Sequence, residues 1–195
     1  MNALAGGDPP MATPQNIRRY HIFLASPGDV GEHRRFVRAF FGDYNIQHAA
    51  AKGIEFLVVD WENYATIGVG EPQKLITRQT LAKFRDSLVL VIGILGQRFG
   101  TKTSTHESGT EEEFETALGY WQEQGHPEIK WFFLDTDRLE VPANWEDRRQ
   151  VLEQWDKVGE FRERLKTGRP ERGDPQVWYA TFQDLKPSRT SFAGT

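Results

Sequence analysis

Ser108-Gly109-Thr110-Glu111-Glu112-Glu113-Phe114 is the stretch of this sequence that decides its fold. It follows the almost wholly apolar run 87–95, which is typical of a strand buried on both faces. Acidic residues in a first helical turn are favoured by the helix dipole, and Thr110 with Glu113 matches a capping box. The pattern predicts a buried strand, a loop and a capped helix over 110–124.

The three carboxylates take different positions around this helix. At about 100° per residue, one stripe of apolar side chains packs on the sheet, namely Phe114, Ala117, Leu118 and Trp121. Glu112 lies nearly opposite the stripe and is predicted to be in water. Glu111 and Glu113 flank the stripe where the helix meets the carboxyl ends of the strands, the usual ligand crevice of an open α/β sheet. We expect one or both of them to face a pocket.

Composition indicates one globular domain with extensions. The chain has 195 residues, of which 38% are hydrophobic and 27% charged. A net charge of −4 and a pI near 5.8 give no electrostatic case for nucleic acid or a membrane surface, and no apolar run approaches the ~20 residues of a membrane span. The absence of cysteine excludes disulfides and fits a reducing compartment. We expect a cytoplasmic protein.

Strand and helix patterns alternate along the chain. Strands are predicted at residues 18–25, 53–61, 87–95, 129–134 and 177–182, and helices at 31–51, 72–84, 110–124 and 144–166. This alternation predicts a three-layer α/β sandwich around a mainly parallel sheet of about five strands. Residues 1–16 are expected to form a disordered leader, 17–182 the α/β domain and 183–195 a polar tail.

Several familiar sites are not indicated. The five histidines are scattered without metal-ligand spacing, so no metal site is expected. No P-loop, no dinucleotide-binding glycine motif and no hydrolase nucleophile elbow follows any strand. What remains is a crevice of polar residues at the carboxyl edge of the sheet.

This crevice has the inventory of a nucleotide or nucleoside site. Trp61 and Phe99 offer aromatic surfaces, Arg98 is a cation for phosphate, and Glu113 is a base or charge stabiliser. The remaining candidate binding residues are Ser26, Asp29, Ser108, Thr110 and Glu111. Simpler interpretations stay open, since Trp61 suits packing, Arg98 can pair with a glutamate, and Asp29 or Ser26 can cap the helix at 31–51.

The motifs that border the crevice resemble one family. Ala25-Ser26-Pro27-Gly28-Asp29-Val30, Trp61 with residues 70–73, residues 97–101, and Ser108 to Phe114 look like the bacterial TIR-like domain of unknown function. The resemblance covers residues 20–182 and implies a TIR or flavodoxin-like architecture. Such domains are often found at the amino end of NACHT, AAA or repeat-bearing signalling proteins.

The resemblance also implies a chemistry. In TIR enzymes, a glutamate on the helix after the third strand assists cleavage of the nicotinamide glycosidic bond of NAD, and Ser108, Glu113 and Phe114 match the spacing of that motif. Nucleoside deoxyribosyltransferase-like proteins are similar through a pattern that Gly109, Thr110, Glu113, Phe114 and Ala117 satisfy. Both resemblances imply that Glu113 is the catalytic residue.

Three functions are compatible with these observations. The first is a signalling or defence domain that binds a nucleotide such as NAD as a substrate, needs no cofactor, and cleaves the nicotinamide bond on forming a homo-oligomer or joining a signalling partner. The alternative is a non-catalytic protein interaction module, in which the acidic motif only caps a helix. A second alternative is a nucleoside deoxyribosyltransferase-like enzyme. The sequence leaves catalysis itself open.

Overall fold

The computed structural model describes residues 16–60, 81–135, 139 and 141–183. Its five strands form one sheet in the order β2-β1-β3-β4-β5, and every neighbouring pair is parallel. The strands are β1 (Arg18–Ala25), β2 (Ile54–Val59), β3 (Leu88–Leu95), β4 (Glu128–Leu134) and β5 (Tyr179–Phe182). This is the strand order of flavodoxin-like doubly wound folds.

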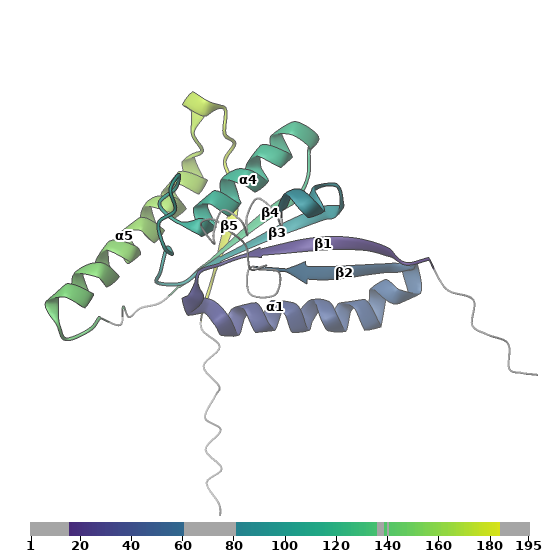
Figure 1. Cartoon of the computed structure of the whole chain (residues 1–195), viewed down its shortest axis with the longest axis horizontal. Coiled ribbons are helices and arrows are strands. Elements are labelled where there is room, and N and C mark those ends of the chain that lie inside the picture. Colours follow the sequence, from purple (N-terminus) through teal and green to yellow (C-terminus); the bar gives the residue numbers. More distant parts are fainter. Residues whose placement is uncertain (1–15, 61–80, 136–138, 140, 184–195) are drawn as a thin grey trace, which may run out of the picture.

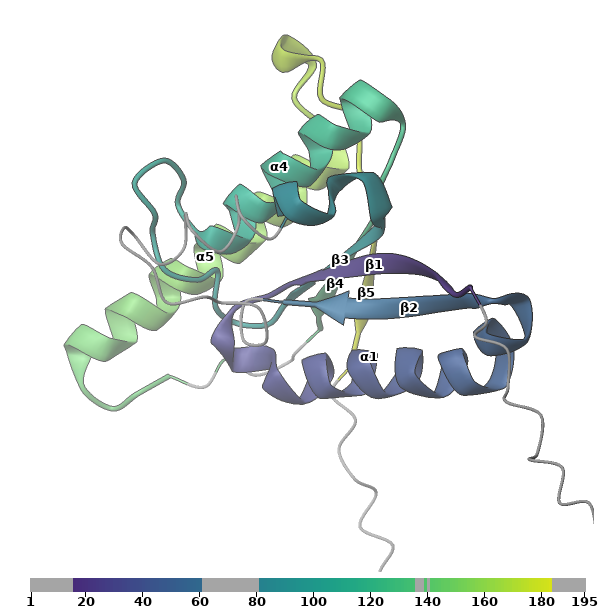
Figure 2. The ribbon, with the colours of Figure 1, turned by 45° about the vertical axis from the view of Figure 1, so that its right-hand side comes forward.

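Helices cover both faces of the sheet. They are α1 (Gly31–Tyr44), which continues through a π-helical turn (Asn45–Ala49) and a 3-10 turn (Ala50–Lys52), α4 (Gly109–Gln124) and α5 (Trp145–Thr167). Figures 1 and 2 show α1 on one face and α4 with α5 on the other. The predicted three-layer α/β sandwich is therefore confirmed. Of the helix predicted at 72–84, only 81–84 is described, and it is helical.

Both faces of the central strands are buried, as their continuous apolar runs predict. Successive strand residues point to opposite sides, so Phe23 and Ala25 enter the core under α4 and α5, whereas Ile22 and Leu24 enter the core under α1. The larger core is centred on Phe161 of α5. Its ring lies 5.3 to 6.4 Å, between centroids, from four other aromatic rings, those of Phe99, Phe114, Trp131 and Phe133.

The start of α4 differs from the prediction in two respects. Ser108, rather than Thr110, is the N-cap, because Ser108 has extended backbone and its hydroxyl accepts a hydrogen bond from the Glu111 amide at 3.0 Å. Thr110 is already inside the helix. The prediction that Glu112 lies in water is also wrong, since the whole first turn is buried and Glu112 is only 4% exposed. Helical periodicity places side chains relative to the sheet alone and contains nothing about the loops around the helix start.

Candidate functional site

The loops that follow β1 and β3 meet at the carboxyl edge of the sheet through Asp29. Its Oδ2 accepts hydrogen bonds from the backbone amides of Gln97 at 2.9 Å and Arg98 at 3.0 Å. A Cβ at Gly96 would lie 2.5 Å from the same oxygen, so this close approach requires glycine. The expectation that Asp29 or Ser26 caps α1 is wrong, because the N-cap is Val30 and no side chain caps the helix.

Ser26 is held in the turn after β1. It is 3% exposed, and its hydroxyl accepts a hydrogen bond from Arg34 Nη1 at 3.2 Å. The same nitrogen donates to the Pro27 carbonyl at 2.6 Å. Arg34 thus anchors the turn to α1, and Ser26 takes part in that anchor at the carboxyl edge.

The loop after β3 is held by α5 and carries an exposed cation. The backbone amides of Phe99 and Gly100 both donate to Gln154 Oε1 at 2.9 Å. The Phe99 ring is 3% exposed and packs on Phe161, so it belongs to the core. The Arg98 side chain is exposed and pairs with no other residue in the described ranges. Trp61 lies outside the described residues.

Glu113 is a buried carboxyl at this edge. It is 1% exposed, and no hydrogen bond or ion pair joins its side chain to another described residue. Burial raises the pKa of Glu113 well above its usual range, and the negative charges of Glu112 and Asp60 raise this pKa further. A buried carboxyl without a partner is costly, and such groups gather at functional sites.

Two further carboxylates surround Glu113. Asp60 directly follows β2, is fully buried, and accepts a hydrogen bond from Arg38 Nε at 2.8 Å. Glu112 is buried beside Glu113, and its Oε2 has no hydrogen-bond partner within the described part of the chain. Together these groups create a negative potential that can stabilise a cation or bind hydroxyls.

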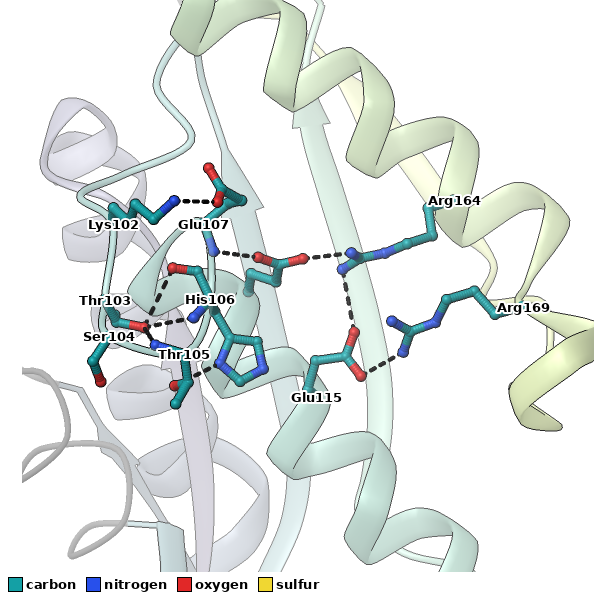
Figure 3. Close-up of a pocket in the computed structure, with 10 residues that line it drawn as sticks. Lys102, Thr103, Ser104, Thr105, His106, Glu107, Glu115, Arg164 and Arg169 are labelled. Atoms are coloured by element: carbon teal, nitrogen blue, oxygen red, sulfur yellow. Dashed lines mark hydrogen bonds and ion pairs between the residues drawn. The ribbon is translucent and has the colours of Figure 1, made fainter.

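A separate cleft of about 480 Å³ opens between the loop 102–107, α4 and the end of α5. Figure 3 shows glutamates and arginines alternating along one of its sides. Glu111 accepts a hydrogen bond from the Glu107 amide at 2.8 Å and pairs with Arg164. Glu115 pairs with Arg164 at 3.3 Å and with Arg169 at 2.5 Å. Glu111 therefore lines a cleft, as expected, whereas Glu113 does not line this one.

We expect the ion pairs of Arg164 to stabilise the packing of α4 on α5. Arg164→Met should lower the free energy of unfolding by about 2–3 kcal/mol, because it leaves the buried Glu111 without its cation. Glu115 keeps its pair with Arg169. Urea denaturation followed by circular dichroism measures this change. The matched control is Lys166→Met on the same helix, whose pair with Glu163 is exposed and should contribute less than about 1 kcal/mol. Equal losses in the two variants would contradict a specific role for Arg164.

Some of these residues carry a signal in the sequence and others do not. Asp60 ends an apolar strand, where a charged residue marks the carboxyl edge, so the pattern points to it. Arg164 occupies a polar position of a long charged helix, and its partner Glu111 lies 53 residues away in the sequence. No local pattern predicts such a pair.

The described residues contain neither a metal-binding cluster nor a membrane-spanning helix. No three or more His, Asp or Glu residues are grouped in a way that would hold a metal ion in the described ranges. None of the helices described combines the length and the apolar character needed to cross a membrane.

Comparison with known proteins gives one family. The domain of unknown function DUF4062 matches residues 21–193, which include β2 to β5, all of β1 after its first three residues, and the whole carboxyl edge. No curated protein and no solved structure matches the chain.

Proposed function

From the premise that this chain belongs to the DUF4062 family of domains of unknown function, we propose that it is a TIR-like domain that binds NAD and cleaves its nicotinamide N-glycosidic bond. The observation that carries this proposal is the buried carboxyl of Glu113 at the carboxyl edge of the sheet, which has no partner among the described residues. The edge is also where ligands bind in open α/β sheets. In this proposal the domain serves signalling or defence and is active as an oligomer.

The charge of the site suits the reaction. When the bond between ribose and nicotinamide breaks, its electrons leave with nicotinamide, and positive charge develops on the ribose. A carboxylate beside the ribose stabilises that charge, and water then completes the hydrolysis to ADP-ribose. In the proposal Glu113 supplies this carboxylate when NAD is bound, because the positive nicotinamide ring opposes the rise in its pKa. The neighbouring Glu112 and Asp60 add to the negative potential. The positive nicotinamide ring of NAD also favours binding here.

The other proposed contacts follow the edge of the sheet. Arg98, exposed and without a partner among the described residues, is proposed to bind the phosphates. Asp29 fixes the backbone of that loop, which supports a defined position for the cation. Trp61 is proposed to stack on a base. The Phe99 ring packs against Phe161 in the core, so Phe99 has no stacking role in this proposal.

Binding measurements with Arg98→Gln test the ligand class. We expect this variant to bind NAD about tenfold more weakly, because a charge-assisted hydrogen bond to phosphate is lost. Its affinity for nicotinamide riboside, which lacks phosphate, should not change. Isothermal titration calorimetry measures both, with Arg19→Gln, an exposed arginine at the amino end of β1, as the control.

The same titrations separate the alternatives. Equal binding of the riboside and of NAD by the unmodified protein would favour the nucleoside enzyme. A protein that binds neither compound would favour the non-catalytic interaction module and would contradict the proposed function.

A further inference from the structure

The outward face of α1 is unusually apolar for a helix in contact with water. α1 lies alone on its side of the sheet within the described part of the chain (Figure 2). Phe36 and Phe40 are 61% and 52% exposed, and Ile46, in the turn that continues the helix, is 80% exposed. Phenylalanine normally contributes a large buried area. Phe36 and Phe40, four residues apart, are neighbours on the helix surface, and exposed apolar side chains that gather in this way mark an interaction surface.

Two small residues lie within this face. Ala39 is exposed three residues after Phe36, and Gly42 is exposed three residues after Ala39. A Cβ at Gly42 would have no atom of the described residues within 4 Å, so no contact in that part of the chain requires glycine there. Glycine inside a helix destabilises it relative to alanine. A close approach of another backbone gives Gly42 a function.

The residues around Ala39 are arranged so that they complement themselves. Arg35 and Asp43 lie four residues before and after Ala39, and Phe36 and Gly42 lie three residues before and after it. If a second α1 packs antiparallel about a two-fold axis at Ala39, Arg35 faces Asp43 of the other copy. Phe36 then lies over Gly42 of the other copy. Both contacts occur twice, as an isologous interface requires.

We propose that α1 is a homodimer interface, with a second copy of this chain packed antiparallel on Arg35, Phe36, Ala39, Gly42 and Asp43. Arg35 is available for this contact, because its side chain is 68% exposed and, among the described residues, pairs only with the exposed Glu32 at 3.5 Å. The spacing of residues 32, 36, 39, 43 and 46 is the three-four repeat of packed helices. This inference does not depend on NAD cleavage.

The expected interface is modest in size. The contact from residue 35 to residue 43 spans nine residues, or roughly 14 Å of helix. Interfaces of this extent give reversible dimers whose population depends on concentration. The proposal therefore predicts a monomer at low micromolar concentration and a growing dimer fraction at high micromolar concentration.

Variants with inverted charges test this arrangement. Their dimer dissociation constants are measured by sedimentation velocity over a series of protein concentrations. Arg35→Asp and Asp43→Arg should each raise the dimer dissociation constant at least tenfold, because each places like charges opposite one another twice. The two single variants mixed together should associate with each other, since every pair then has opposite charges. The double variant Arg35→Asp with Asp43→Arg should recover the dimer alone.

Two matched variants test the apolar part of the proposed interface. Phe36→Ser should weaken the dimer, whereas Trp178→Ser, which removes an aromatic residue that is 88% exposed elsewhere, should not. Circular dichroism confirms that each variant is folded. A protein that stays monomeric at every concentration would overturn the proposal. So would a dimer insensitive to the charge inversions, or single variants that do not associate when mixed, as expected if α1 instead docks a different protein.

Discussion

Glu113→Gln is expected to make the folded protein more stable at pH 8. Burial and two neighbouring carboxylates raise the pKa of Glu113 in the folded state, whereas in the unfolded chain it is about 4.3. Between these two pKa values the folded state holds more protons, so stability falls as pH rises through that interval. Glutamine has nearly the same shape and no charge to bury, so the variant does not incur this loss.

Thermal unfolding at several pH values measures the effect. The melting temperature of Glu113→Gln should exceed that of the unmodified protein at pH 8, and the difference should shrink toward pH 4. Glu128→Gln is the matched control, because Glu128 is exposed on β4 and pairs with Lys130 at the surface. A difference in melting temperature between Glu113→Gln and the unmodified protein that is the same at every pH would contradict the raised pKa. A variant that is more stable but inactive is typical of a residue retained for function.

Gly93→Ala is expected to cause the largest loss of stability among the substitutions considered. Gly93 lies in the middle of β3, and a Cβ there would lie 2.2 to 2.3 Å from three ring atoms of Trp131. Trp131 is 1% exposed and packed among Phe114 and Phe161, so its ring has no free space to move into. Overpacking of a core costs about 1–3 kcal/mol and sometimes more. We expect a value at or above the upper end.

Urea denaturation of Gly93→Ala gives this value directly. The control is Gly159→Ala in α5, where a Cβ meets no atom within 4 Å. That change should stabilise the protein by about 0.5–1 kcal/mol, because alanine favours a helix over glycine. If Gly93→Ala lowered the free energy of unfolding no more than Gly159→Ala does, the close packing of Trp131 on Gly93 would be contradicted.

The sheet could be predicted from the sequence because its determinants are local. The apolar run that became β3 is buried on both faces, and Gly125 ends α4 in the left-handed conformation that glycine favours. The fifth strand begins at Tyr179 rather than at residue 177, because the Val177 amide donates to the Leu165 carbonyl at the end of α5. That hydrogen bond is a tertiary contact that the strand pattern does not contain.

The assignment of the site residues stays a prediction. Motif spacing selected Glu113, and the structure adds that its carboxyl is buried without a described partner. Asp29 was expected to cap α1, but its hydrogen bonds reach amides 68 and 69 residues away. Such long-range contacts depend on how the loops come together at the sheet edge, which no local pattern encodes.

Nicotinamide release from NAD by the purified protein at high concentration, measured alongside Glu113→Gln and Glu128→Gln, tests the central claim most directly. The proposed function predicts release by the unmodified protein and by Glu128→Gln, with a loss of at least about 100-fold in Glu113→Gln. Release that persists in a folded Glu113→Gln variant, or no release by the unmodified protein under conditions where it is dimeric, would contradict the assignment of Glu113 as the catalytic residue of an NAD hydrolase.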